Sequence, residues 1–214
     1  MIGIFRHGKT DWNVIHKIQG RTDVPLNEEG IASAKRAAEE VAMCKFDICY
    51  VSPLIRARQT AEIITEGSEI EIRVDKRLSE ISFGKYEGSE GVYGIPDHPL
   101  HDFFFAPEKY KAVNGAESLE ELLERIRDFY EEVLKDCINR KKNVLIVAHG
   151  ALNAGLITFL LGNDKKDFWS YGQSNCTMFR FYPDDPERTK AENSSTFIKQ
   201  MTEKDLAASV FKNR

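Results

Sequence analysis

The sequence predicts an α/β protein, a three-layer α/β/α sandwich in which a mainly parallel sheet lies between two layers of helices. Short apolar runs of strand length alternate with segments of helical periodicity along most of the chain. This alternation is typical of parallel strands joined by helices that cover both faces of a sheet. With 214 residues, 42% of them hydrophobic and 30% charged, the chain can bury the core that such a fold requires. We expect one domain over residues 1–214.

In the first part of the chain, the expected strands and helices are joined by short connections. Ile2–Phe5 is a short apolar run that predicts a buried strand, and Asn27 is placed to cap a helix that runs to Cys44. Asp47–Val51 predicts a second strand. Ser52 is a good N-cap residue and Pro53 suits the first helical position, so the next helix is expected to begin there.

The middle of the chain is less regular. Val74–Leu78 predicts a strand, whereas Phe83–Ala116 is rich in glycine, proline and aromatic residues and is expected to be an irregular insertion. Ser118 and Glu121 have the spacing of a capping box, and apolar residues recur at helical spacing from there to Leu134. We therefore expect a helix over residues 118–134.

The last part predicts a strand, a helix and a further strand. Val144–Ala148 is fully apolar, and a helix is expected from Gly150 to Leu161, where Gly162 can end it. Cys176–Tyr182 predicts one more strand. In the polar tail, Thr196–Met201 could pair at a sheet edge before a short helix that starts at Glu203.

Charge and cysteine spacing exclude several classes of function. The net charge of −4 provides no basic excess to neutralise a nucleic-acid backbone, so no nucleic-acid partner is expected. The four cysteines show neither C-x-x-C pairing nor the dense spacing of a disulfide framework. We interpret them as reduced thiols without a metal role: Cys44, Cys49, Cys137 and Cys176.

The apolar stretch Val144–Leu161 is the one candidate for a membrane span. His149 and Asn153 interrupt it near its middle, where polar groups are costly, so a buried strand followed by a helix explains it better. At the N-terminus, Arg6 and His7 end the apolar run too early for a signal peptide. We expect no membrane association and a cytoplasmic protein.

Residues Gly3–Thr10 spell G-x-x-x-x-G-K-T, the pattern of a phosphate-binding Walker loop. Such a loop follows a strand, but too few residues precede Gly3 to form one, and Ile4 and Phe5 resemble strand interior. A nucleotide hydrolase of this class also needs an acidic residue after a later apolar strand to hold Mg²⁺, and here His149 follows that strand. The match is therefore interpreted as accidental.

Unusual polar residues follow three of the expected strands. Arg6 and His7 end the first, Ser52 with Arg56 follows the second, and His149 follows Val144–Ala148. Ligands of parallel α/β folds bind at the carboxyl ends of the strands, so these side chains are candidates for one shared site. A neutral imidazole can attack phosphorus, and guanidinium groups suit the phosphoryl oxygens.

The segments that carry these residues closely resemble the histidine phosphatase superfamily, also called the phosphoglycerate mutase-like family. The likeness covers residues 3 to about 161, and its segments stand in the family's order. They are Arg6–Asn13, Ser52–Ala57, Leu78–Gly88 with Glu80, Gly115–Ser118 and Val147–Gly150. The resemblance implies the phosphoglycerate mutase-like fold, with an insertion around residues 83–116 that covers the active site.

The resemblance also implies an activity and roles for residues. His7 would be the nucleophile that forms a phosphohistidine, Arg6, Arg56 and His149 would surround the phosphoryl group, and Glu80 would be the proton donor and later the base. Guanidinium groups would supply the charge that Mg²⁺ supplies elsewhere, so neither a metal nor a cofactor is expected. Secondary contacts to phosphate or substrate would come from Asn13, Gln19, Gly20 and the backbone N–H of Ala151.

Some neighbours of these residues have competing interpretations. Glu87 and Glu90 lie close to Glu80, so the assignment of the acid rests on the family motif. Arg58 is interpreted as a surface neighbour of Arg56. His98 and His101 are interpreted as loop residues rather than metal ligands, because no further ligand lies near them. The run Phe103–Phe105 either closes over the substrate or anchors the insertion, and both remain open.

Two activities share this chemistry. The segment Leu78–Gly88 resembles the phosphatase version of the motif, which favours hydrolysis of a small phosphorylated metabolite over a cofactor-dependent phosphoglycerate mutase. A non-catalytic phosphate-binding regulatory protein is a third hypothesis, against which the intact His7, Glu80 and His149 speak. No pattern in the chain indicates an oligomeric state.

Overall fold

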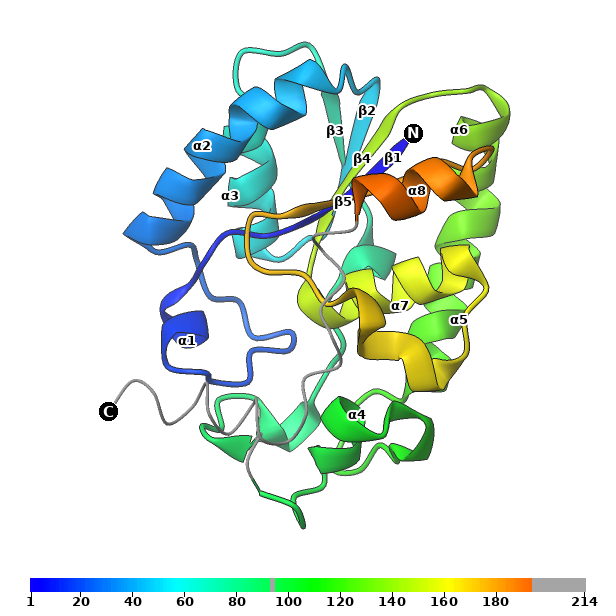
Figure 1. Ribbon diagram of the computed structural model, residues 1–214. Coiled ribbons are helices and arrows are strands. Elements are labelled where there is room, and N and C mark those ends of the chain that lie inside the picture. Colours follow the sequence, from blue (N-terminus) through cyan, green and yellow to red (C-terminus); the bar gives the residue numbers. More distant parts are fainter. Residues whose placement is uncertain (93–94, 194–214) are drawn as a thin grey trace.

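The computed structural model describes residues 1–92 and 95–193. Within that part of the chain, five strands form one sheet in the order β3-β2-β4-β1-β5 (Figure 1). Four of them are mutually parallel and β5 runs antiparallel to β1, so the predicted, mainly parallel α/β architecture is confirmed. The strands are β1 Ile2–Arg6, β2 Ile48–Val51, β3 Glu71–Val74, β4 Val144–Ala148 and β5 Met178–Phe181.

The register of the central strands brings three chain segments to one edge. Arg6 at the end of β1 is opposite Ala148 at the end of β4, and Val51 of β2 is opposite Val147. Because these strands are parallel, the residues that follow them leave the sheet at the same edge. His7, Ser52 and His149 are those residues.

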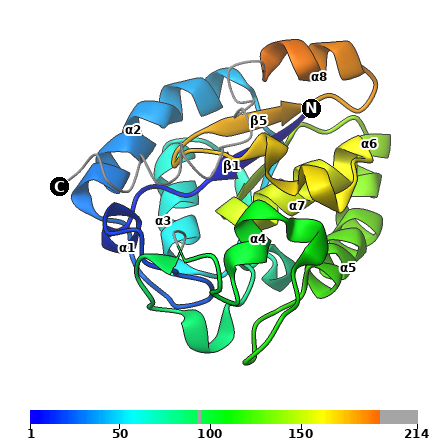
Figure 2. The ribbon, with the colours of Figure 1, turned by 60° about the horizontal axis from the view of Figure 1, so that its bottom comes forward.

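Helices cover both faces of the sheet. α2 and α3 lie on one side, and α5 and α7 lie on the other (Figures 1 and 2). Tyr130–Leu134 forms a π-helical turn between α5 and α6, so the expected helix over residues 118–134 forms but changes its winding before its end. The helices are α1 Asp11–Val14, α2 Glu28–Met43, α3 Ile55–Ile64, α4 His101–Phe105, α5 Leu119–Phe129, α6 Lys135–Asn139, α7 Gly150–Leu161 and α8 Pro186–Glu192.

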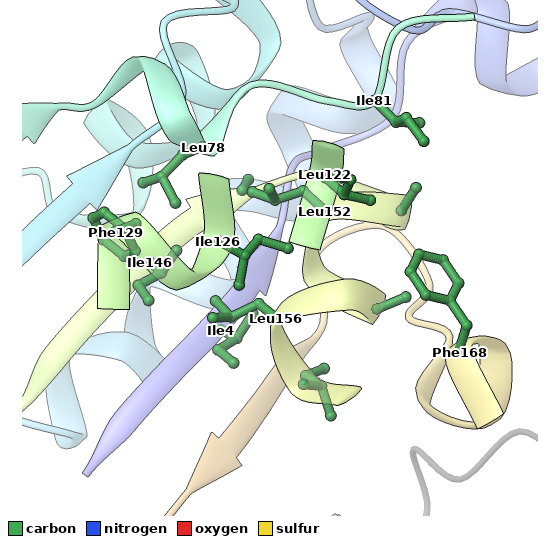
Figure 3. Close-up of a cluster of buried hydrophobic side chains, with 14 of the residues drawn as sticks. Ile4, Leu78, Ile81, Leu122, Ile126, Phe129, Ile146, Leu152, Leu156 and Phe168 are labelled. Atoms are coloured by element: carbon green, nitrogen blue, oxygen red, sulfur yellow. The ribbon is translucent and has the colours of Figure 1, made fainter. Parts of the chain in front are cut away.

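The core lies in two layers, one on each side of the sheet. Successive strand residues point to opposite faces, so Ile4 and Ile146 pack toward α5 and α7 (Figure 3), whereas Phe5 and Val147 pack toward α2 and α3. Burial on both faces explains why these strands read as continuous apolar runs. Gly3 has no room for a side chain, since a Cβ there would lie 2.6 Å from Cζ of Phe46.

Caps at two helix starts agree with the sequence, and one does not. The side chain of Asn27 accepts the N–H of Gly30, and Ser118 with Glu121 forms the expected capping box. The helix expected at Ser52 begins instead at Ile55, whose N–H donates to Oδ1 of Asp23 at 2.7 Å. The carboxylate of a distant loop therefore caps α3, and Ser52 has a different partner.

The strand expected at Val74–Leu78 lies earlier, because β3 spans Glu71–Val74. The side chain of Asp75 accepts the N–H of Arg77 and starts a 3₁₀ turn over Lys76–Leu78. β3 is an edge strand whose residues are all exposed, so it lacks the apolar pattern that marks the buried strands. Within residues 71–78 only Leu78 is fully buried, and it is the apolar residue of the turn Lys76–Leu78.

The segment between residues 83 and 116 is irregular, as expected, with short 3₁₀ turns around α4. Phe83 and Ala116 pair in an isolated antiparallel bridge that joins its two ends. Phe103 is fully buried, its ring meets Phe83 edge-on at 5.1 Å, and its carbonyl accepts Nε1–H of Trp169 at 2.7 Å. Phe103 therefore anchors the insertion.

Three further expectations concern the rest of the chain. The strand at Thr196–Met201 and the helix from Glu203 lie outside the described residues. All four cysteines are free thiols. None of the helices in the described residues is long and apolar enough to cross a membrane.

Candidate active site

His7 lies directly after β1 and is only 3% exposed. Its Nδ1 is 2.7 Å from the carbonyl oxygen of Gly8, which can only accept, so Nδ1 carries the proton. In the neutral ring the lone pair is then on Nε2. Burial lowers the pKa of His7 well below 6.5, and the positive charges of Arg56 and Arg6 lower this pKa further. His7 is therefore a neutral, oriented imidazole at neutral pH.

His149 follows β4 and its ring centroid lies 5.1 Å from that of His7, so the two rings can contact one anion. Its Nε2 is 2.7 Å from Oγ of Ser52, the residue that follows β2. Its buried Nδ1 has no hydrogen-bond partner among the described residues. Burial lowers the pKa of His149 well below 6.5, with Arg56 and His7 as the next causes.

Arg56 projects from α3 and is only 1% exposed. Its two terminal nitrogens donate to the carbonyls of Gly20 at 2.7 Å and Thr22 at 2.9 Å, while Nε has no partner within the described chain. Burial lowers the pKa of Arg56 to about 10, which leaves the guanidinium charged at neutral pH. A buried positive charge is thus fixed beside both histidines.

Gly20 contributes to this arrangement through its backbone. It has a left-handed conformation with φ +52°, and a Cβ there would lie 2.2 Å from Oε1 of Glu87. Only glycine fits this turn without strain, and the turn aims the carbonyl of Gly20 at Arg56. We expected Gly20 to contact phosphate or substrate. In this structure its carbonyl holds Arg56.

Arg6 is the last residue of β1, and its side chain reaches the start of α7. A Cβ on Gly150 would be 3.5 Å from Cζ of Arg6, so the guanidinium packs against the first turn of that helix. One terminal nitrogen of Arg6 donates to the carbonyl of Gln173. The buried side chain of Gln173 in turn donates to the carbonyl of Ile4 at 2.8 Å, which ties its loop to β1.

The carboxylate of Glu80 caps α7. Its Oε2 accepts the N–H of Ala151 at 3.1 Å and its Oε1 accepts the N–H of Leu152 at 2.9 Å. The residue is 8% exposed, and His149 is the N-cap residue of the helix whose amides it accepts. A negative group is favoured at a helix N-terminus, so Glu80 here uses the amide that we expected to contact phosphate.

The alternative acids have other partners. Glu87 accepts the backbone N–H groups of Arg21 at 3.0 Å and Phe83 at 3.1 Å, so it holds two loops together. Glu90 pairs with Lys17 at 3.0 Å on the surface. Of these three carboxylates, Glu80 is the one that accepts amides in the first turn of α7. Arg58 is exposed, in agreement with its interpretation as a surface residue.

Asn13 and Gln19 meet at the hydroxyl of Thr10. Thr10 Oγ1 lies 3.1 Å from both Asn13 Oδ1 and Gln19 Oε1, and it can donate to one at a time. Asn13 also accepts the N–H of Thr10 in a capping box at the start of α1. Asn13, in α1, and Gln19, in the loop after it, are therefore both tied to Thr10, three residues after His7.

Comparison with known proteins identifies the family. The family model of the histidine phosphatase superfamily (branch 1) matches residues 2–193. The chain belongs to the histidine phosphatase superfamily. Phosphoserine phosphatase 1 of Hydrogenobacter thermophilus is 32% identical over 175 residues, which cover 81% of this chain and 82% of that protein. The uncharacterized phosphatase PhoE of Bacillus subtilis is 37% identical, over 75% of this chain and 77% of its own length.

Solved structures of histidine phosphatases have the same fold. A mycobacterial glucosyl-3-phosphoglycerate phosphatase, solved as a complex with VO₃, superposes with a TM-score of 0.74 at 29% identity. It covers 83% of this chain and 90% of its own. These matches indicate a phosphatase-type enzyme, and they establish the phosphoglycerate mutase-like fold that the motifs imply.

Several residues that shape this histidine phosphatase site were missed by sequence reasoning. Thr60 accepts the N–H of Gly8 at 2.9 Å and donates to the carbonyl of Arg56 at 2.7 Å. Its position four residues after Arg56 on α3 is a signal that could have revealed it. Asn175 donates to the carbonyl of His7 at 2.9 Å from the loop before β5, and no local pattern indicates that contact.

Proposed function

We propose that this histidine phosphatase hydrolyses the phosphomonoester of a small phosphorylated metabolite through a phosphohistidine formed on His7, without a metal ion. The observation that carries the proposal is the hydrogen bond between Nδ1 of His7 and the Gly8 carbonyl. It leaves a lone pair on Nε2 of a neutral imidazole, beside the guanidinium groups of Arg6 and Arg56. A nucleophile and charge stabilisation are the two requirements of phosphoryl transfer.

In the first step Nε2 of His7 attacks phosphorus as the bond to the leaving oxygen breaks. Glu80 donates a proton to that oxygen, so the product alcohol leaves neutral. Arg6, Arg56 and Nδ1–H of His149 bind the equatorial oxygens, where negative charge must be stabilised. Glu80 moves off the amides of Ala151 and Leu152, which then become donors for the same phosphoryl group.

In the second step water attacks the phosphohistidine. The carboxylate of Glu80 takes a proton from the water, the phosphorus–nitrogen bond breaks, and Nε2 recovers its lone pair. Orthophosphate then leaves, and Glu80 is again protonated for the next cycle. Two steps at one nucleophile allow the same carboxyl group to serve first as acid and then as base.

The intermediate can be tested by trapping it. The protein is mixed with a ³²P-labelled phosphomonoester and quenched in base, and we expect a base-stable, acid-labile label on the wild type. His7→Ala should carry no label, whereas the matched control His98→Ala, which removes a histidine in the insertion, should be labelled normally. Metal-free turnover at the wild-type rate by His7→Ala would refute the proposal.

The substrate is proposed as a class, and we propose that the insertion around residues 83–116 selects it. A panel of phosphorylated metabolites, including phosphoserine because one relative is a phosphoserine phosphatase, would rank substrates by kcat/KM. Interconversion of 3-phosphoglycerate stimulated by bisphosphoglycerate would indicate a mutase instead. Absence of para-nitrophenyl phosphate turnover would favour a phosphate-binding regulatory protein.

A further inference from the structure

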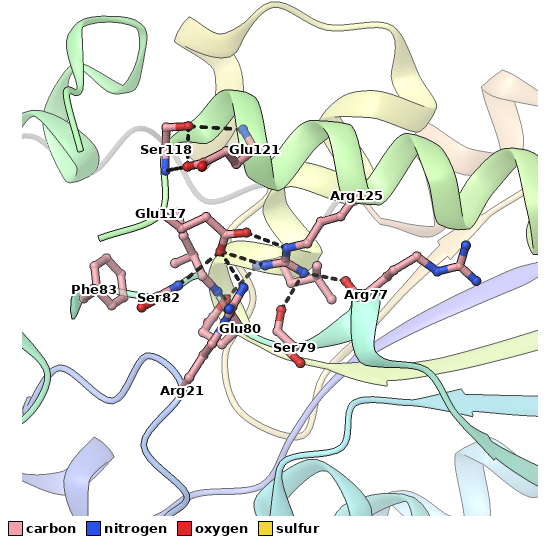
Figure 4. Close-up of polar contacts among 12 residues, drawn as sticks. Arg21, Arg77, Ser79, Glu80, Ser82, Phe83, Glu117, Ser118, Glu121 and Arg125 are labelled. Atoms are coloured by element: carbon pink, nitrogen blue, oxygen red, sulfur yellow. Dashed lines mark hydrogen bonds and ion pairs between the residues drawn. The ribbon is translucent and has the colours of Figure 1, made fainter. Parts of the chain in front are cut away.

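A charged cluster lies beside Glu80 and has no role in the steps above. Glu117, at the end of the insertion, forms a two-pronged ion pair with Arg125 of α5 (Figure 4). Nε of Arg125 is 2.7 Å from Oε1 of Glu117, and a terminal nitrogen is 3.1 Å from Oε2. The two side chains are only 15% and 10% exposed. Paired, hydrogen-bonded charges of this kind fix geometry as well as adding attraction.

Arg125 and Glu117 also form hydrogen bonds with the backbone on both sides of Glu80. Arg125 donates to the carbonyl of Ser79 at 2.8 Å and also to that of Arg77. On the other side, Oε2 of Glu117 accepts the N–H of Ser82 at 3.1 Å, and the Glu117 N–H donates to the Ser82 carbonyl at 2.8 Å. The segment that carries Glu80 is therefore held one residue before it and two residues after it (Figure 4).

Arg21, which follows Gly20 in the loop between α1 and α2, also contacts this cluster. A terminal nitrogen donates to Oε2 of Glu117 at 3.1 Å, and its Nε donates to the carbonyl of Glu80 itself at 3.1 Å. Of the four hydrogen bonds given above to the backbone of residues 79–82, three thus come from guanidinium or carboxylate groups that meet at Glu117. The loop with Gly20 and the segment with Glu80 are linked through this carboxylate.

Glu80 depends on such support because its segment belongs to neither a helix nor a strand. Residues 79–82 lie between the 3₁₀ turn Lys76–Leu78 and the bridge at Phe83, so no sheet ladder fixes their orientation. The cluster is not required to start α5, because Ser118 and Glu121 already form the capping box there. Its contacts point instead to the segment that carries the carboxyl group.

We propose that Arg125 and Glu117 are positioning residues for Glu80, which hold its backbone so that the carboxyl group can reach the leaving oxygen. This inference rests on the proposed role of Glu80 as proton donor. Neither residue touches the reacting atoms of the proposed steps. Loss of either should therefore impair proton donation selectively and leave nucleophilic attack by His7 nearly intact.

Leaving groups of different basicity separate these effects. Nitrophenolate leaves without a proton, whereas phenolate, which is more basic, benefits from one, so kcat/KM is measured for para-nitrophenyl phosphate and phenyl phosphate. Arg125→Met and Glu117→Gln should lose roughly tenfold more activity on phenyl phosphate than on para-nitrophenyl phosphate, a part of the roughly hundredfold or larger effect of a full general acid. Arg125→Lys keeps the charge but not the planar fork, and should fall between wild type and Arg125→Met.

Two reference variants make the outcome decisive. Arg127→Met replaces an exposed arginine on the same helix and should change neither rate. Glu80→Gln should show the same leaving-group dependence as the cluster variants, and more strongly. Uniform losses on both substrates in Arg125→Met and Glu117→Gln, with a selective loss in Glu80→Gln, would overturn the positioning role alone. Uniform losses in Glu80→Gln would overturn its role as the acid and this inference with it.

Discussion

Oγ of Ser52 lies 2.7 Å from Nε2 of His149, although the two residues are 97 positions apart in the chain. Both follow parallel strands, β2 and β4, and both are fully buried. Oγ of Ser52 also accepts the N–H of Leu54 at 3.3 Å, and its own proton is free to point to the ring. In the tautomer that accepts this proton at Nε2, Nδ1 of His149 carries the ring proton and can donate to an anion.

Replacement of Ser52 should weaken phosphate binding by freeing the ring of His149. For Ser52→Ala we expect kcat/KM to fall by roughly five- to thirtyfold, which corresponds to about 1–2 kcal/mol for one buried hydrogen bond. The measurement is steady-state turnover of para-nitrophenyl phosphate. Ser68→Ala, in the loop that leads to β3, is the matched control, and an equal loss there would contradict the assignment.

Two buried threonines differ in whether their hydroxyls have partners, and this difference predicts opposite effects of the same substitution. Thr60→Val should destabilise the fold by about 1–3 kcal/mol and lower activity, because the N–H of Gly8 loses its acceptor beside His7. Thr158→Val should be neutral or stabilising, because its hydroxyl has no partner among the described residues. Urea unfolding of both variants checks the pair. If Thr60→Val and Thr158→Val have the same small effect on the free energy of unfolding, the hydrogen bond to Gly8 has little effect on stability.

Gly20 and Gly67 both have a positive φ, but only Gly20 has atoms close to where a Cβ would lie. Alanine substitutions at these two positions therefore separate backbone strain from steric overlap. Gly67→Ala, with φ +75° and open space around it, should cost about 1 kcal/mol and leave activity unchanged. Gly20→Ala also has a positive φ and places Cβ 2.2 Å from Oε1 of Glu87, so either the turn that aims its carbonyl at Arg56 or the carboxylate that accepts the N–H of Arg21 must shift. We expect a much larger loss of kcat/KM for Gly20→Ala. Thermal unfolding and turnover are measured together.

The buried histidines should make stability depend on pH above the range in which carboxylates titrate. Burial holds the pKa of His7 and of His149 well below 6.5 in the folded protein, whereas unfolded histidine titrates near 6.5. The unfolded chain therefore binds more protons in the window below 6.5. The stabilisation that depends on the two histidines being neutral is therefore complete above pH 6.5. It is lost as pH falls, by at most about 1.4 kcal/mol per pH unit for each histidine.

Urea unfolding at pH 7.5, 6.5 and 5.5 measures this slope. His149→Asn should reduce the slope between pH 6.5 and 5.5, because one of the two buried imidazoles is gone. His16→Asn, which replaces an exposed histidine with a residue that tolerates its positive φ, serves as the control. Stability that is constant from pH 7.5 to 5.5 in the wild type would contradict the prediction.

The sequence predicted those parts of the structure that local patterns determine. Apolar runs marked β1, β2 and β4, and the unusual residues after them met at one edge because parallel register requires it. β3 was misplaced because it is a short, exposed edge strand in which apolar and charged residues alternate, without the continuous apolar run of the buried strands, and the buried Leu78 lies in the turn that follows. Local periodicity cannot distinguish these cases.

Long-range polar contacts could not be predicted in the same way. Ser52 has the chemistry of an N-cap, but Asp23 caps α3 and Ser52 binds His149. The contacts of Arg125 with residues 77 and 79 span more than 40 positions and leave no mark in the local sequence. Such pairings depend on how the loops pack, which the pattern of apolar residues does not specify.

The loop before β5 has a consequence for how the protein is made. Asn175 supports the backbone of His7 from 168 positions away, and Gln173 supports Arg6 from nearly the same distance. Translation proceeds from the N-terminus, so His7 and Arg6 leave the ribosome well before Gln173 and Asn175, which support them. A nascent chain that has completed β4 but not β5 can begin to form its sheet, but it should not yet have a competent site.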